Sequence, residues 1–294
     1  MSAHPLGPSE IYPALATGVS ARMINLRTGV RVRVAESGPR DGPPVLMLHG
    51  WGASLYAFRH GLELLAAQGF RVIAPDLRGF GLSDHPAHPG AYSLDAYLGD
   101  LDALLDALEL ERLGLVGHSM GGGLSLRFAL KNPDRLYALA LINPTGLVHA
   151  TPLSVTRVAP VWVAEAIGEH MVPRWLIRVI LERVAYGDPS RLTPRDIEEY
   201  WAPTQIPGYT RTVRRTASEF DWTPLSEREA QSLSVPTAVV LGTSDRLVWH
   251  AGPAARRLRG AGVHEVRGGH CVHEERPDEV FRILGDLFSR RATG

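Results

Sequence analysis

Short runs of hydrophobic residues alternate with helical patterns along most of the chain, beginning near residue 22. Within residues 29–38, Val30, Val32 and Val34 occupy every second position, which is typical of a half-buried strand. Longer apolar runs, each ended by turn-forming residues, span residues 43–50, 70–76, 112–118 and 136–144, and a strand pattern returns at residues 235–245 and 262–270. Such runs predict strands of a parallel sheet that is covered on both faces.

Residues 93–110 carry the clearest helical pattern between two of these runs. Ser93 is a suitable N-cap, and the apolar side chains that follow it fall on one face of a helix. The repeated order of strand, helix and strand predicts an α/β fold, in which a doubly wound, mostly parallel sheet is built with right-handed crossovers.

The alternation stops after Pro144 and returns near residue 235. Residues 146–231 contain helical pieces that are separated by prolines, and no segment of them has a convincing strand pattern. We therefore predict a core domain formed by residues 1–145 and 232–294, with a helical cap (residues 146–231) inserted between two of its strands. An insertion at the carboxyl ends of the strands would lie over the place where open α/β sheets hold their ligands.

Composition and charge argue against several classes of function. The 31 basic residues balance the 31 acidic residues, so the chain has no net field that would attract nucleic acid or anionic lipid. The single cysteine, Cys271, excludes an internal disulfide bond and fits the reducing cytoplasm, where we expect the protein. Residues 1–18 lack the features of a signal peptide, and no run of 18 apolar residues occurs, so we expect no membrane insertion. The sequence leaves open whether the protein is a monomer or a homodimer.

The sequence Gly-His-Ser-Met-Gly at residues 117–121 follows an apolar run and opens a helical pattern that Pro133 ends. Gly-x-Ser-x-Gly between a strand and a helix predicts a tight turn that strains the backbone of its central residue. Gly117 and Gly121 remove the side chains that would otherwise collide in this turn. The turn therefore presents the hydroxyl group of Ser119 at the edge of the sheet, beside a helix N-terminus that favours negative charge.

A serine hydroxyl becomes a good nucleophile only when a base takes its proton, and that base is commonly a histidine held by a carboxylate. Residues 266–280 place His270, Cys271 and His273 close to several glutamates. This stretch is compatible with a metal site, with a cysteine nucleophile beside its base, or with one catalytic histidine among bystanders. Its residues alone do not decide among the three.

Five segments together resemble the α/β-hydrolase fold family over nearly the whole core. They are similar to that family's oxyanion loop, the loop after its fourth strand, its nucleophile elbow, its acid turn and its histidine loop: LHGWGAS (48–54), APDLRGFGLSD (74–84), GHSMGG (117–122), LGTSDRLV (241–248) and GGHCVHEERPDEV (268–280). The resemblance implies an eight-stranded sheet and the chain order serine, acid, histidine.

Carried over residue by residue, the resemblance implies that Ser119 is the nucleophile, Asp245 the acid and His270 the base. It also implies an oxyanion hole made by the backbone N–H groups of Trp51 and Met120. Ser119, Asp245 and His270 each follow an expected strand, so we expect them to converge at the carboxyl edge of the sheet.

The resemblance also gives an interpretation of the neighbours of His270. For His273, at the expected start of the last helix, capping or packing is favoured over catalysis. Cys271 is interpreted as a small buried residue. No partner set with the spacing of a zinc site appears around these residues, so we expect no metal.

Other polar residues in the core are interpreted as structural. We expect Asp76, Arg78 and Asp84 to hold their loop together, and His49 to be a hydrogen-bonded core histidine. Asn143 ends the sixth strand, where some relatives carry the acid. Because an amide cannot stabilise an imidazolium as a carboxylate does, we expect no competitor for Asp245 there.

The family supports several chemistries, so the reaction has to be argued from the site. Ser119 argues against haloalkane dehalogenase and epoxide hydrolase activity, because those relatives use an aspartate at the elbow. Carbon–carbon bond hydrolases of aromatic degradation do use serine. They usually have Gly-Pro-Gly after the oxyanion turn and a tryptophan after the histidine, where this chain has Gly-Trp-Gly and Cys271. Proline iminopeptidases carry a tryptophan after the serine, where this chain has Met120.

The function favoured by these residues is hydrolysis of carboxylic esters, which needs no cofactor. A carbon–carbon bond hydrolase of aromatic meta-cleavage products stays open as an alternative. A cofactor-free perhydrolase or an acyltransferase would share every residue named above. A hydrolase-like small-molecule receptor, which can keep the fold and even the triad, is the alternative from outside the enzymes.

The apolar residues of the cap predict a pocket for a hydrophobic small-molecule ester, which is the partner we expect. Most of the cap's aromatic residues are interpreted as its own small core. The candidates for lining the pocket are Trp51, Trp162, Trp175, Trp201, Leu247 and Val248. Residues 172–187 are compatible with a lipid-surface helix, but a cap helix packed on the active site is favoured.

Overall fold

Eight strands form one sheet in the part of the chain that the computed structural model describes, residues 5–14, 16–148 and 172–292. In chain order they are β1 (Val19–Asn25), β2 (Arg31–Ser37), β3 (Pro44–Leu48), β4 (Arg71–Pro75), β5 (Leu113–His118), β6 (Leu136–Ile142), β7 (Thr237–Gly242) and β8 (Gly262–Val266). Their order in the sheet is β1-β2-β4-β3-β5-β6-β7-β8. Only the β1–β2 and β2–β4 pairs are antiparallel. The predicted fold, an α/β architecture with a mostly parallel eight-stranded sheet, is confirmed.

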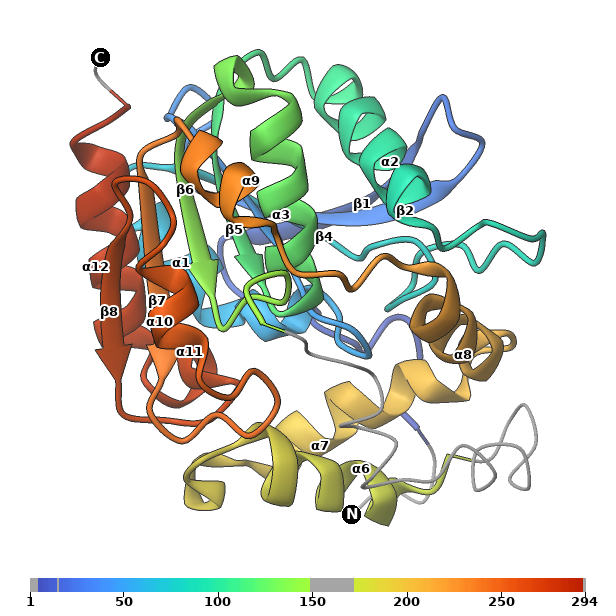
Figure 1. Ribbon diagram of the computed structural model, residues 1–294. Helices are drawn as coiled ribbons and strands as arrows, with labels where there is room; N and C mark the ends of the chain where they lie inside the picture. The colour runs from blue at the N-terminus through green and yellow to red at the C-terminus, as the bar shows by residue number, and fades with distance from the viewer. Residues whose placement is uncertain (1–4, 15, 149–171, 293–294) are drawn as a thin grey trace.

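Helices of the core cover both faces of this sheet. They are α1 (Arg59–Ala66), α2 (Leu94–Ala107), α3 (Met120–Lys131), α10 (Ala251–Ala255), α11 (Val272–Glu275) and α12 (Pro277–Ser289), with the short turns η1 (Leu55–Phe58) and η2 (Pro133–Arg135). Figure 1 shows α2 and α3 on one face and α1 and α12 on the other. The predicted N-cap is confirmed, because the Ser93 hydroxyl accepts a hydrogen bond from the N–H of Ala96 at 3.2 Å.

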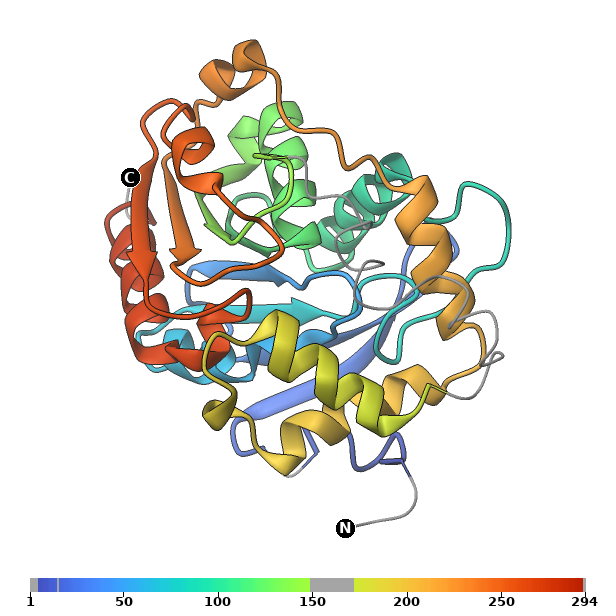
Figure 2. The same ribbon diagram turned by 60° about the horizontal axis from the view of Figure 1, so that its bottom comes forward.

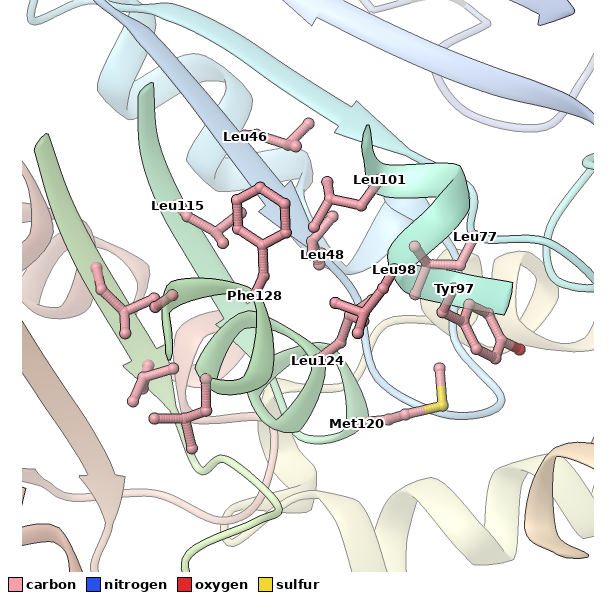
Figure 3. Packing of buried hydrophobic residues seen from close by; sticks show 14 of the residues in the cluster. Leu46, Leu48, Leu77, Tyr97, Leu98, Leu101, Leu115, Met120, Leu124 and Phe128 are labelled. Carbon is pink, nitrogen blue, oxygen red and sulfur yellow. The ribbon is translucent and has the colours of Figure 1, made fainter. Parts of the chain in front are cut away.

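Alternation along the central strands divides the core between the two faces. In β3, Leu46 and Leu48 pack with the cluster that includes α2 and α3, whereas Val45 and Met47 pack with the cluster that includes α1 and α12. Figure 3 shows Leu46 and Leu48 packed among side chains of α2 and α3. All four residues are fully buried. Burial on both faces of the sheet explains why the sequence of this strand is a continuous apolar run.

Between β6 and β7 the described residues form helices. They are α6 (Arg174–Ile180), the π-helical turn η3 (Leu181–Ala185), η4 (Pro189–Arg191), α7 (Pro194–Trp201), η5 (Ala202–Gln205), α8 (Tyr209–Glu219) and α9 (Glu227–Ser232). Figure 1 shows the arrowheads of β6, β7 and β8 pointing toward α6 and α7, and Figure 2 brings these helices forward. We call residues 172–231 the cap. The boundaries given above for the two domains stay a prediction.

A buried polar network fastens the cap to the core. The Glu274 carboxylate in α11 pairs with Arg59 of α1 at 2.5 Å and accepts hydrogen bonds from Tyr186 and Tyr200 of the cap at 3.0 and 2.5 Å. Arg59 also pairs with Asp196 of α7 at 2.8 Å. Because each charge in this network has an opposite charge or a hydrogen bond, its burial is compensated.

The strand β1 is the element that the hydrophobic pattern did not identify. Its residues are mostly exposed, and only Val19 and Ile24 are partly buried. A strand with little buried surface has no apolar alternation to reveal it, and its pairing with β2 becomes visible only in three dimensions. Among the helices of the described residues, none is long and apolar enough to cross a membrane.

A pair of helical glycines tests how tightly the core is packed. A methyl group on Gly61 of α1 would lie 2.5 Å from the ring of Phe281 in α12, whereas one on Gly99 of α2 would meet its first neighbour at 3.9 Å. Alanine gains about 1 kcal/mol over glycine in a helix, but overpacking costs about 1–3 kcal/mol. Gly61→Ala should therefore lower the free energy of unfolding in urea and Gly99→Ala should raise it. An increase with both substitutions would contradict this packing.

Candidate active site

Ser119 occupies the turn between β5 and α3 with φ of 53° and ψ of −118°, a conformation that non-glycine residues rarely adopt. Its N–H donates to the carbonyl of Ile142 at 3.1 Å, and its own carbonyl accepts from the N–H of Thr145 at 3.0 Å. A Cβ atom on Gly121 would lie 2.1 Å from the carbonyl oxygen of Leu48, so the turn is packed directly on the end of β3. The strained strand-to-helix turn predicted from the motif is present.

The loop after β3 adjoins Ser119. A Cβ atom on Gly50 would lie 3.0 Å from Cβ of Ser119. The cap fixes the next two residues, because the Trp51 indole N–H donates to the carbonyl of Val213 at 3.2 Å and the Tyr209 hydroxyl donates to the carbonyl of Gly52 at 3.2 Å. This loop is therefore held between the serine turn and α8.

Asp245 and His270 form a buried pair at the ends of β7 and β8. His270 Nδ1 lies 2.8 Å from Oδ2 of Asp245. The other carboxylate oxygen accepts the N–H groups of Leu247 and Val248 at 2.7 and 3.1 Å. Burial by itself raises the pKa of Asp245, but the interaction with His270 and these hydrogen bonds outweigh it and lower the pKa below its usual value. Asp245 is therefore held as the ionised partner of the histidine.

The residue before Ser119 contacts His270. His118 precedes Ser119, its ring centroid lies 4.8 Å from that of His270, and its Nε2 lies 3.0 Å from the carbonyl oxygen of His270. Among the hydrogen bonds of the described residues, none joins the Ser119 hydroxyl to His270. Catalytic hydrogen bonds of this kind are often long or poorly aligned without substrate.

Asn143 holds the histidine loop from the side of the sheet. It follows β6 with a φ of 40°, and its amide donates to the carbonyl oxygens of Gly269 and His270 at 3.0 and 2.9 Å. Its Oδ1 accepts the N–H of Gly242 at 2.8 Å. Sequence reasoning excluded Asn143 as the acid but missed this role, because nothing in the sequence shows which loop faces the amide.

The neighbours of His270 are buried, as the sequence indicated. Cys271 packs with Leu181 and Ala185 of the cap, and burial followed by the charge of Glu274 raises the pKa of its thiol well above the usual value. The thiolate, which is the nucleophilic form, is therefore disfavoured. His273 is fully buried in α11 and packs against the rings of His118 and Phe58, with centroid separations of 4.4 and 5.3 Å.

The polar residues that were interpreted as structural do hold the surrounding loops. His49 Nε2 accepts the N–H of Leu77 at 2.9 Å, so its Nδ1 donates to the carbonyl of Gly50 at 2.8 Å. Asp76 pairs with Arg33 at 2.7 Å. Arg78 forms two hydrogen bonds of 2.5 Å to Asp100, and Asp84 accepts the N–H of Arg31 at 2.9 Å. These predictions are confirmed.

The candidates for lining a pocket have different surroundings. The Trp201 indole donates to the carbonyl of Val172 at 2.8 Å, within the cap. Trp175 lies on α6 with 63% of its surface exposed, and its place in the pocket stays a prediction. Leu247 and Val248 contribute backbone N–H groups to Asp245, and their side chains pack in the core cluster. Trp162 lies outside the described residues.

A groove of about 740 Å³ lies between β8 and α12 and is lined by residues such as Val235, Arg259 and Arg282. None of the catalytic candidates lines it. In the described part of the chain, no group of three or more histidine, cysteine or acidic side chains is arranged to hold a metal ion.

A strained serine turn and an acid–histidine pair at the ends of parallel strands define a hydrolase of the α/β class. Consistent with this, the sequence model described as alpha/beta hydrolase fold matches residues 43–277. The chain belongs to the α/β hydrolase fold family.

Individual relatives differ in the reactions that their names state. The chain is 45% identical over 306 residues to "Epoxide hydrolase 2" of Siraitia grosvenorii, covering 89% of this chain and 96% of that protein. Among solved structures, a serine-to-alanine variant of the meta-cleavage product hydrolase CumD from Pseudomonas fluorescens IP01, complexed with acetates, has a TM-score of 0.78 at 25% identity. That match covers 92% of this chain and 97% of CumD. The epoxide hydrolase CorEH has a TM-score of 0.75 at 25% identity, covering 92% and 99% of the two chains. These likenesses support a hydrolase.

Substitution of His273 tests the cost of a buried histidine beside the site. Neither ring nitrogen of His273 has a hydrogen-bond partner among the described residues. Burial, followed by the charges of His118 and Arg59, lowers its pKa well below the usual value. An unsatisfied buried polar group costs about 1–3 kcal/mol, so His273→Leu should raise the free energy of unfolding at pH 8 by that order.

The pH dependence should change as well. Because the folded-state pKa is lowered, only the unfolded chain binds this proton between the two pKa values, and the parent loses stability as pH falls below about 6.5. His273→Leu should reduce this slope by up to about 1.4 kcal/mol per pH unit, as measured by urea denaturation from pH 8 to pH 5. The same change at His264, which is exposed on β8, is the matched control. Equal slopes for the parent and His273→Leu would contradict the prediction.

Proposed function

We propose that the protein is a serine hydrolase that cleaves carboxylic esters of a hydrophobic small molecule through an acyl-enzyme. The observation that carries the proposal is the 2.8 Å pair between His270 and the ionised Asp245, at the same edge of the sheet as the strained Ser119 turn. In this proposal Ser119 is the nucleophile, His270 the general base and Asp245 the acid that orients it.

The reaction proceeds in two halves. Oγ of Ser119 forms a bond to the ester carbonyl carbon while its proton passes to Nε2 of His270, and the carbonyl oxygen becomes an oxyanion. His270 then returns the proton to the leaving alcohol as the carbon–oxygen bond breaks. Water attacks the acyl-enzyme by the same route, releasing the acid and restoring Ser119. The Asp245 carboxylate keeps Nδ1 protonated, so that Nε2 is free to act as the base.

We assign the oxyanion hole to the backbone N–H groups of Trp51 and Met120. The Trp51 loop adjoins Ser119, and Met120 is the first residue of α3, whose N-terminus favours negative charge. Removal of one donor from such a site costs on the order of 10²- to 10³-fold in turnover. The hydrogen bonds from Trp51 and Tyr209 join this loop to the cap and would keep the donors in place.

Epoxide opening, the reaction in the names of several relatives, does not suit Ser119. Attack of a serine oxygen on an epoxide carbon would form an ether, which has no carbonyl group for water to attack. The enzyme would therefore be inactivated after a single turnover. An acyl-enzyme formed from an ester is itself an ester and can be hydrolysed, so the residue at the elbow favours acyl transfer.

Hydrolysis of a carbon–carbon bond in an aromatic meta-cleavage product is the second candidate. It is favoured by the likeness to CumD, in whose structure a serine was replaced by alanine. Perhydrolysis and acyl transfer would use the same residues and differ only in the acceptor. A small-molecule receptor would bind the ligand without turnover.

The setting of the enzyme is proposed from the same observations. We place the substrate between the core and the cap, beside the loop whose Trp51 indole bonds to the carbonyl of Val213 in α8. No cofactor or metal takes part in the proposed reaction. We propose a cytoplasmic monomer or homodimer that binds neither nucleic acid nor membranes, in keeping with its balanced charge.

A series of p-nitrophenyl esters from acetate to laurate tests this function. The parent should hydrolyse the esters with a preferred chain length, because an apolar pocket discriminates by size. Ser119→Ala should lower kcat/KM on the order of 10⁴-fold or more, since the nucleophile is lost. Cys271→Ala is the control and should keep the activity, because the buried thiol takes no part.

Failure of the parent to cleave any member would contradict the ester proposal. Cleavage of a vinylogous meta-cleavage diketo acid, abolished by Ser119→Ala, would then support the second candidate. Tight binding of an ester or of the diketo acid without turnover would instead support a function as a small-molecule receptor.

A further inference from the structure

Two glycines bring the cap into backbone contact with the loop that carries His270. A Cβ atom on Gly187 of the cap would lie 2.6 Å from the backbone nitrogen of Gly269, and one on Gly269 would lie 2.3 Å from the nitrogen of Gly187. Real Cβ atoms do not approach backbone this closely, so only glycine fits at either position. The two backbone segments therefore pack without any side chain between them.

The Glu275 carboxylate joins these two backbones. Its Oε1 accepts the N–H of Gly269 at 2.6 Å and the N–H of Gly187 at 3.1 Å, while Oε2 accepts the N–H of Asp188 at 2.8 Å. Only 2% of Glu275 is exposed. A buried carboxylate that accepts three backbone N–H groups is compensated for its lost hydration, and each of these bonds is charge-assisted.

The cap also bonds directly to the other side of His270. The N–H of Cys271 donates to the carbonyl of Ala185 at 3.0 Å. The residues before and after His270 are thus both tied to the cap, Gly269 through Glu275 and Cys271 through Ala185. On the opposite side, Asn143 holds the carbonyl groups of the same loop.

We propose that Glu275 is a positioning residue that couples the cap to the proposed base, so that His270 is aligned only while cap residues 185–188 are docked on its loop. This inference rests on the proposed function, because it assigns a purpose to the alignment of His270. Glu275 does not touch the reacting atoms. It acts by fixing the backbone from which the imidazole projects.

The consequence should appear in the chemical step. A shift of about 1 Å in a catalytic group can cost on the order of 100-fold in rate, even when the change lies away from the reacting atoms. Substrate binding depends on the pocket more than on the angle of His270, so kcat should fall while KM changes little.

Glu275→Gln and Glu275→Ala test the coupling. Glutamine keeps one acceptor oxygen for Gly269 and Gly187 but presents an amide N–H₂ group to Asp188, whereas alanine removes every acceptor. We expect kcat to decrease in the order parent, Gln, Ala, with an overall loss on the order of 10- to 100-fold. Glu279→Gln makes the same chemical change on the exposed face of α12 and should leave kcat unchanged.

Gly187→Ala tests the same coupling by steric means. Its Cβ atom would push the cap away from Gly269 and should lower kcat in the same way, whereas Gly99→Ala should not. The free energy of unfolding is measured for each variant, and assays are run where each is fully folded. If a variant loses activity only because part of it is unfolded, its kcat per folded molecule will equal that of the parent. That result would overturn the proposal.

A fluorophosphonate reagent separates failure of this inference from failure of the proposed function. Ser119 Oγ displaces fluoride from phosphorus with His270 taking the proton, whatever the natural substrate. The coupling is supported if the reagent labels the parent and labels Glu275→Ala and Gly187→Ala more slowly. Equal labelling rates for the parent and the two variants overturn it.

Failure of the reagent to label the parent protein would refute the proposed function instead. The coupling is then judged by amide hydrogen exchange at Gly269 and Cys271, whose N–H groups bond to Glu275 and Ala185. Faster exchange in Gly187→Ala than in Gly99→Ala supports it, and unchanged exchange overturns it.

Discussion

The parallel register of β5, β6, β7 and β8 is the constraint on which the rest of the site depends. His118 at the end of β5 is paired with Ile142 at the end of β6, and Gly242 of β7 with Val266 of β8. The loops after these strands must therefore leave the sheet at one edge. Residues that are far apart in the sequence meet there because their strands end together, and no contact between the loops is needed to bring them close.

Close backbone packing turns this proximity into a defined geometry. Gly121 lets the serine turn rest on β3, and Gly187 and Gly269 let the cap rest on the histidine loop. Buried polar side chains then fix what the glycines bring together, with Asn143 on the sheet side and Glu275 on the cap side. The groups proposed to react are thus supported by residues that take no part in the chemistry.

The sequence predicted the features that depend on local pattern. Continuous apolar runs identified the buried parallel strands, and the Gly-x-Ser-x-Gly motif identified the strained turn at Ser119. It missed β1, which buries too little surface to show a pattern. It also missed the supporting roles of Asn143 and Glu275, because a side chain that binds backbone N–H or carbonyl groups of a distant loop leaves no spacing to recognise. Hydrophobicity alone also does not tell which face of a cap helix is turned to solvent, and Trp175 of α6 is largely exposed.

The central claim is that catalysis passes through a covalent bond to Ser119. It is tested most directly by mixing the protein with p-nitrophenyl butyrate, quenching in acid within the first turnover, and locating any butyryl group by mass spectrometry of the peptides. We expect one butyryl group per protein, on the peptide that contains Ser119 and on its hydroxyl. Release of p-nitrophenol with no adduct on Ser119, or with the adduct on Cys271, would contradict it.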